Sequence, residues 1–123
     1  MDNLKKLLLI QLLLVVVLSV PVYLNTGALF FFVKSNSMYP AIPQGSIILI
    51  SGREPDLKNL VNKVIVFYNP LDEKVVVHRV VREDKGFLLT RGDNNDFPDD
   101  VRPRRKNIFG TVIFILKVPF LAK

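Results

Sequence analysis

A chain of 123 residues provides material for one compact domain, and half of its residues are apolar. It contains no cysteine, which excludes disulfides, a thiol nucleophile and thiolate metal sites. The net charge of +6 fits acidic lipid headgroups or nucleic acid, and the N-terminal apolar block described next favours lipid.

Residues 7–24 form this apolar block, which has no charged side chain. About 18 to 20 such residues span a bilayer as a helix, so the block predicts a membrane anchor. Lys5 and Lys6 precede it and the next basic residue is Lys34, which places the N-terminus in the cytoplasm by the positive-inside rule. A cleaved secretory signal, with its nearest cleavage site at residues 25–28, is the alternative. We expect a single-pass transmembrane anchor at residues 1–27 and a folded extracytoplasmic domain at residues 28–123.

Six stretches beyond the anchor predict strands, because β-branched and aromatic residues dominate them. They are residues 28–33, 46–50, 64–68, 74–82, 87–90 and 108–116. Turn-forming residues at 69–72 and 84–86 separate some of them, and residues 51–62 predict a loop or a single helical turn. Gly110 predicts a bulge or kink within the last strand. No window outside the anchor has sustained helical periodicity, so the domain is expected to be mainly β.

Two features near the C-terminus have alternative interpretations. Residues 114–121 are apolar apart from Lys117, and a core strand and a contact with the bilayer surface explain them equally well. A basic cluster precedes the last strand and is interpreted as a solvated turn rather than a headgroup site. Its members are Arg102, Arg104, Arg105 and Lys106.

Residues 35–45 form a loop that contains two prolines. Pro40 fixes its own φ and restricts Tyr39 to extended geometry, which keeps the neighbouring Ser37 out of a helix. A hydroxyl in a rigid turn of this kind can face outward as a nucleophile. The same residues would also make an ordinary turn.

His78 is the only histidine and lies within a valine-rich stretch, where a buried structural histidine is the common case. Histidine is also the side chain whose unperturbed pKa suits a general base near neutral pH. A serine nucleophile needs such a base, so the candidates are His78 and a lysine with a depressed pKa.

Four carboxylates in residues 92–100 could orient such a base. They are Asp93, Asp96, Asp99 and Asp100. A solvated acidic loop and a calcium site are the alternatives, but Asp93-Asn94-Asn95 does not have the spacing of an EF-hand loop.

Together these segments resemble type I signal peptidases of the archaeal and endoplasmic-reticulum kind. Residues 35–40, S-N-S-M-Y-P, match the S-x-S-M-x-P motif of that family, and residues 77–80, V-H-R-V, match its strand motif. Residues 92–95, G-D-N-N, and Asp99 match its acidic segment. Bacterial and mitochondrial relatives have lysine in the strand motif, so His78 indicates the serine–histidine type. Asn36, where many relatives have glycine, and Ser46, where an aspartate is common, depart from the pattern.

The resemblance implies a signal-peptidase-like coiled β-sheet domain with one N-terminal transmembrane helix. It also implies Ser37 as nucleophile, His78 as general base, Asp99 as third member and Asp93 as a second acid at or near the site. The Ser35 hydroxyl and the Ser37 N–H would form the oxyanion hole. Which aspartate contacts the imidazole stays open, and no metal or cofactor is expected.

The expected function is removal of signal peptides from exported preproteins at the outer membrane surface. The peptide would add as a strand to an edge formed by residues 30–32 or 75–77. Expected partners are signal peptides, the lipid bilayer, and a translocon or accessory subunits, but no nucleic acid. Two alternatives are a peptidase of the same family with a narrow set of surface-protein clients, and a non-catalytic anchored domain that binds peptides.

Overall fold

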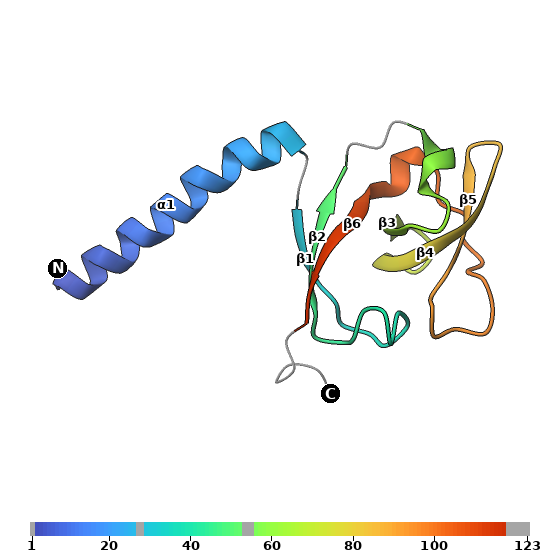
Figure 1. The fold of residues 1–123 in the computed structure, drawn as a ribbon, viewed down its shortest axis with the longest axis horizontal. Coiled ribbons are helices and arrows are strands. Elements are labelled where there is room, and N and C mark those ends of the chain that lie inside the picture. Colours follow the sequence, from blue (N-terminus) through green and yellow to red (C-terminus); the bar gives the residue numbers. More distant parts are fainter. Residues whose placement is uncertain (1, 27–28, 53–55, 118–123) are drawn as a thin grey trace.

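One helix precedes six strands in the computed structural model, which describes residues 2–26, 29–52 and 56–117 (Figure 1). The elements are α1 (Asn3–Thr26), β1 (Leu29–Phe32), β2 (Ile47–Ser51), the 3-10 helix η1 (Leu57–Leu60), β3 (Val64–Asn69), β4 (Lys74–Asp84), β5 (Phe87–Arg91), the 3-10 helix η2 (Arg105–Asn107) and β6 (Ile108–Leu116). The mainly β fold with one N-terminal helix is therefore confirmed. Each predicted strand is present, with small shifts at its ends.

The start of β2 shows why strand ends shift. Ser46 was predicted to begin the strand, but its backbone N–H and its hydroxyl both donate to the Pro43 carbonyl, at 3.2 and 2.7 Å. These bonds keep Ser46 in the turn that follows the proline-containing loop, so the strand begins at Ile47.

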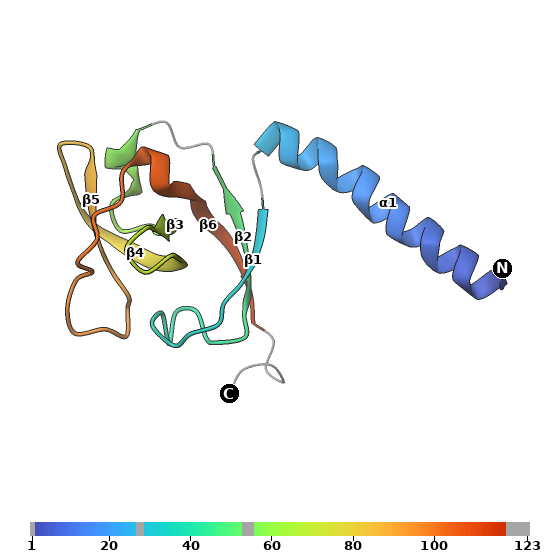
Figure 2. The ribbon, with the colours of Figure 1, turned by 180° about the vertical axis from the view of Figure 1, so that it is seen from behind.

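The strands form one antiparallel sheet in the order β1-β2-β6-β3-β4-β5. β6, the last strand in the chain, lies between β2 and β3 and so joins the two parts of the sheet (Figures 1 and 2). The β3–β6 register shifts next to Gly110, as the predicted bulge requires. A Cβ at Gly110 would lie 2.6 Å from the Ser51 carbonyl oxygen, so this close approach of two strands needs glycine.

Alternation along the strands divides the core between the two faces of the sheet. In β3, Val66 belongs to one buried cluster, whereas its neighbours Ile65 and Phe67 belong to the other. The first, the Met38 cluster, consists of Val33, Met38, Ile42, Ile48, Ile50 and Val66. The second, the Phe67 cluster, consists of Leu60, Ile65, Phe67, Val80 and Leu88.

α1 extends away from the sheet (Figures 1 and 2). The side chains of residues 7–18 are all exposed, and Gln11 is the only polar one among them. Among the helices of the described residues, none combines the length and the apolar character that a membrane crossing requires. The predicted division at residues 27 and 28 falls outside the described residues and stays a prediction.

The structure describes part of the C-terminal apolar segment and all of the basic cluster that precedes the last strand. Ile115 packs against the Met38 cluster, whereas Phe114 and Leu116 are exposed. Residues 118–121 of the predicted apolar segment lie outside the described part of the chain. The basic cluster is exposed around η2, as expected for a solvated turn, and the Arg104 guanidinium lies 5.2 Å from the centre of the Phe87 ring.

Candidate active site

The loop that carries Ser37 is closed by backbone hydrogen bonds between its two ends and is anchored by side chains buried in the core. Val33 donates to the Ser46 carbonyl at 2.9 Å, and Gly45 donates back to the Val33 carbonyl at 2.8 Å. Met38 and Ile42 are buried in the Met38 cluster, so the residue that follows Ser37 is fixed in the core. Ser37 itself is half-buried, and its backbone is positioned by this packing.

The hydroxyl of Ser37 contacts the only histidine of the chain. Ser37 Oγ lies 3.0 Å from His78 Nε2, and His78 Nδ1 lies 2.6 Å from Asp99 Oδ2. His78 is 8% exposed, and the three side chains come from the proline-containing loop, from β4 and from the loop after β5. The arrangement gives a hydroxyl, an imidazole and a carboxylate in hydrogen-bonding sequence.

Thr90, which no sequence motif marked, holds the carboxylate in place. Its hydroxyl donates to Asp99 Oδ2 at 2.6 Å, and its carbonyl accepts from the Asp99 N–H at 2.8 Å. Thr90 is fully buried in β5. The available signal was a polar residue on the same face of that strand as the buried Leu88 and shortly before the G-D-N-N segment.

Asp93 has a different partner from Asp99. Both of its carboxylate oxygens accept hydrogen bonds from the Arg79 guanidinium, at 2.9 and 2.8 Å. This hydrogen bonding lowers the pKa of Asp93 and raises the pKa of Arg79, while partial burial opposes both shifts. Arg79 also donates to the Asn62 carbonyl at 2.8 Å. The pair therefore ties the loop after β5 to β4, next to His78.

The G-D-N-N segment packs directly against the serine loop. Asn94 donates from its backbone to the Ser37 carbonyl at 2.8 Å and from its side chain to the Asn36 carbonyl at 3.1 Å. A Cβ at Gly92 would lie 2.6 Å from the Ser37 carbonyl oxygen and 3.0 Å from His78 Nε2. Glycine is thus required where these two loops meet the imidazole.

The residues predicted for the oxyanion hole lie together. Ser35 Oγ is 3.1 Å from Ser37 Oγ and accepts a long hydrogen bond of 3.5 Å from the Ser37 N–H. Both donors are therefore beside the hydroxyl that would attack. Their role in catalysis stays a prediction.

The predicted substrate edges need one correction. β1 is an edge strand, as expected, but β4 lies between β3 and β5. Its residues 74–78 pair with β3, whereas its pairing with β5 begins only at Arg79. The side of residues 75–77 that faces away from β3 thus has no strand partner within the described sheet. β4 departs from the prediction because it continues past His78 into the hairpin with β5.

No group of three or more His, Asp or Glu side chains in the described part of the chain is arranged to hold a metal ion. Two of the four aspartates of the loop have different partners: Asp93 pairs with Arg79, and Asp99 pairs with His78.

Comparison with known proteins gives a family match over most of the chain. Residues 15–113 match the Peptidase S24-like family. The chain is 37% identical over 92 residues to the signal peptidase complex catalytic subunit SEC11 of Metarhizium acridum, a match that covers 66% of this chain and 54% of that protein. For SEC11 of Clavispora lusitaniae the identity is 39% over 79 residues, 61% of this chain and 46% of that protein. For SEC11 of Saccharomyces cerevisiae it is 38% over 76 residues, 58% and 44% respectively.

The chain spans about half the length of the curated relatives it matches. Their names confirm the resemblance to signal peptidases of the endoplasmic-reticulum kind that the sequence motifs indicated.

Proposed function

This chain belongs to the Peptidase S24-like family, and from that premise we propose that it is a serine endopeptidase that removes signal peptides from exported preproteins. The observation that carries the proposal is the contact of Ser37 Oγ with His78 Nε2 at 3.0 Å. Its support is the 2.6 Å contact of the other ring nitrogen with Asp99, which would fix the tautomer of the imidazole. The names of the relatives support the choice of substrate.

In the proposed mechanism, Ser37 Oγ attacks the carbonyl of the scissile peptide bond while His78 Nε2 accepts its proton. Asp99 stabilises the imidazolium through Nδ1–H. The negative charge that forms on the carbonyl oxygen would be held by the Ser37 N–H and the Ser35 hydroxyl, which requires these donors to turn from each other to the substrate. His78 then gives the proton to the leaving amine, and water releases the acyl group by the reverse route.

The substrate would bind as an added strand. β1 is an edge strand and residues 75–77 of β4 lack a partner on one side, so both offer free backbone groups to an extended peptide. Small side chains before the scissile bond would face the Met38 cluster, to which Val77 is packed. This binding would place the carbonyl beside Ser37.

We also propose that α1 keeps the domain at a membrane. A helix whose apolar residues surround its axis is stable where its environment is also apolar, and residues 7–18 are exposed on every side. With Lys5 and Lys6 on the cytoplasmic side, the sheet domain would lie on the extracytoplasmic side as a single-pass protein. Accessory subunits or a translocon would be its partners, since the relatives are named as subunits of a complex.

The test is cleavage of a preprotein by the full chain in detergent. We expect Ser37→Ala and His78→Ala each to lower kcat/KM by about a thousandfold or more, because each removes a member of the proton-transfer chain. Cleavage at the original rate by either variant would overturn the mechanism. His78→Lys should also lose activity, because the longer amine cannot occupy the position of an imidazole held by Asp99.

Lysine substitutions test the alternative base. Lys34→Ala and Lys63→Ala change two exposed lysines and should retain cleavage. Loss in either, together with activity in His78→Ala, would favour a lysine base. Mapping the mature N-termini that disappear when the protein is depleted from cells distinguishes a general signal peptidase from one with a narrow set of clients.

A further inference from the structure

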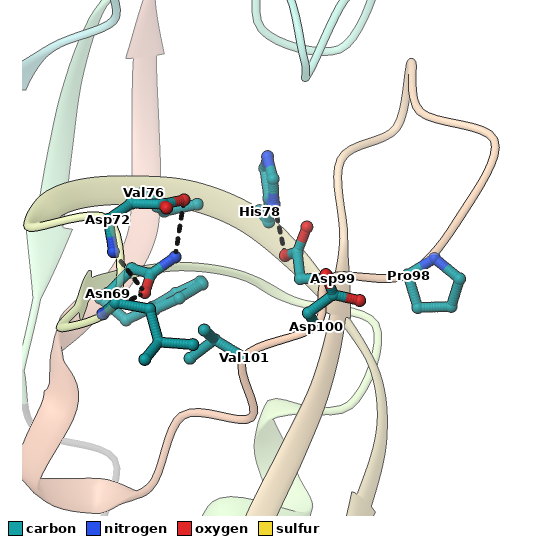
Figure 3. Close-up of a pocket in the computed structure, with 10 residues that line it drawn as sticks. Asn69, Asp72, Val76, His78, Pro98, Asp99, Asp100 and Val101 are labelled. Atoms are coloured by element: carbon teal, nitrogen blue, oxygen red, sulfur yellow. Dashed lines mark hydrogen bonds and ion pairs between the residues drawn. The ribbon is translucent and has the colours of Figure 1, made fainter.

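A cavity beside the imidazole has no role in the mechanism above. It has a volume of about 350 Å³ and is lined by both His78 and Asp99, while Ser37 and Met38 are not part of its wall. Phe67 and Val76 contribute apolar side chains to its wall, together with residues of the β3–β4 turn and of the loop through Val101. Figure 3 shows Val76, His78, Asp99 and Val101 around it. The cavity therefore lies on the Phe67-cluster face of the sheet.

The charges of this cavity all have one sign. Asp72 and Asp100 line it and are exposed, and Asp99 lies deeper, bonded to His78 and Thr90. No lysine or arginine lines the cavity. A cavity with apolar side chains in its wall and carboxylates at its opening matches a lysine or arginine side chain, which has an apolar stem and a cationic end.

The register of β4 indicates which peptide residue reaches the cavity. Val76 and His78 point to the face of the cavity, whereas Val77 packs against the Met38 cluster on the other face. Residues directly opposite each other in a strand pair point to the same face, and successive residues alternate. A peptide residue opposite Val76 would thus direct its side chain into the cavity.

The position of the hydroxyl sets the register of the scissile bond. Ser37 Oγ contacts His78, and the nearest residue on the free edge of β4 is Val77. From Arg79 onward this edge is covered by β5, so an added strand can pair only with the residues of β4 before Arg79. In the inferred binding mode the attacked carbonyl belongs to a residue opposite Val77, and the peptide runs parallel to β4 with the residues before the scissile bond along this edge. The residue before the one that bears the attacked carbonyl then lies opposite Val76.

We propose that this cavity is a specificity subsite for the second residue before the scissile bond and that it favours lysine or arginine there. The inference rests on the proposed function, because it takes the site of cleavage and the bound strand from it. It adds a preference that depends on charge, in contrast to the small-residue preference of the opposite face.

The experiment compares peptides that differ only at this second residue, as lysine, glutamine or glutamate, with the full chain in detergent. We expect kcat/KM to be about tenfold higher for lysine than for glutamate, with glutamine between them, and the ratio to shrink at high salt. In the double variant with Asp72→Asn and Asp100→Asn, the ratio of kcat/KM for the lysine peptide to that for the glutamate peptide should fall to about twofold or less. The reason is that kcat/KM of the glutamate peptide rises while that of the glutamine peptide is unchanged. Asp84→Asn, an exposed aspartate at the far end of β4, is the matched control and should keep the wild-type ratio.

Three outcomes overturn the inference. Equal rates for the three peptides in the wild type would show that the cavity selects no charge, while the proposed function would stand. A charge preference at a neighbouring position of the peptide, and not at the second, would show that the register is wrong. If none of the three peptides is cleaved, the inference and the proposed function are both refuted. The first two outcomes refute the inference alone, so the two failures can be told apart.

Discussion

A single carboxylate oxygen organises the imidazole. Asp99 Oδ2 lies 2.6 Å from His78 Nδ1 and accepts from Thr90 Oγ1 at the same distance. The Thr90 hydroxyl donates to this oxygen and so keeps the carboxylate turned toward the ring. Asp99 and Thr90 thus act as a unit around His78.

This unit gives a first prediction. Thr90→Val removes the hydroxyl at similar volume and should lower kcat/KM by about ten- to hundredfold, the value of one hydrogen bond to a charged group. Asp99→Asn should lower it further, because the amide favours the wrong imidazole tautomer. The measurement is the pH profile of kcat/KM for both variants, with the melting temperature as a control for folding. A Thr90→Val enzyme with the wild-type profile and rate would refute the positioning role.

The Arg79–Asp93 pair is expected to contribute to stability, while the predicted role of Asp93 as a second acid stays a prediction. Its hydrogen bonds lower the pKa of Asp93 in the folded state, so the unfolded chain binds more protons at acidic pH. The contribution of Asp93 is then present above the unfolded pKa of about 4 and is lost as the pH falls through the lower folded pKa.

The second prediction follows from that sign. Asp93→Asn should be less stable than the wild type at pH 7, and the difference should decrease on acidification below about pH 4. Chemical unfolding at several pH values measures it, and Arg79→Gln, which removes the same pair from the other side, should behave alike. A difference that is constant with pH would contradict the assignment of the pair.

At the scale of elements, the site is formed where two loops meet above β4. The serine loop is held by the Met38 cluster, and the loop after β5 is held by the Arg79–Asp93 pair and by Thr90. Gly92 lies at their contact, within reach of the Ser37 carbonyl and His78 Nε2. The separation of the hydroxyl from the imidazole therefore depends on close packing of two backbones.

The third prediction concerns this contact. Gly92→Ala places a methyl group 2.6 Å from a backbone oxygen, so the loops must separate, and kcat/KM should fall by about a hundredfold. Gly86→Ala is the control. Its φ of +85° makes alanine strained, but no atom lies within 4 Å of the added carbon, so it should cost about 1 kcal/mol of stability without loss of activity. An active Gly92→Ala enzyme would show that the contact is not needed.

At the scale of the whole molecule, β6 connects the part of the sheet that carries Ser37 with the part that carries His78. β1 and β2 flank the serine loop, while β3, β4 and β5 carry the histidine and the two loops around it. Since β6 pairs with both β2 and β3, residues 108–116 set the relative position of the two sets of proposed catalytic groups. α1 lies outside this unit (Figure 1).

The fourth prediction tests the proposed role of α1. The full chain should sediment with membranes, and Leu12→Arg combined with Leu13→Arg should release it, because each arginine at the centre of an apolar helix costs about 2.5 to 3.5 kcal/mol in a bilayer. Val81→Arg, which adds a charge to an exposed strand position, should remain bound. Wild-type protein that is entirely in the soluble fraction would refute the membrane proposal.

Much of the fold could be predicted because strands are a local property. Runs of β-branched residues mark β3 and β4, and prolines and glycines mark turns between strands. The order of the strands could not be predicted, because β6 pairs with residues far away in the sequence and no local pattern encodes a partner.

The sequence by itself determined which groups are available for catalysis: one histidine, no cysteine, and a serine in a proline-bounded loop. His78 could be named without coordinates because histidine occurs once, and Ser37 because residues 35–40 resemble a family motif. Only the tertiary structure decided that Asp99 and not Asp93 contacts the imidazole, that Thr90 supports it, and that a cavity opens behind it. Those choices depend on how two loops and two faces of a sheet pack together, and packing of segments distant along the chain has no signature in the spacing of residues.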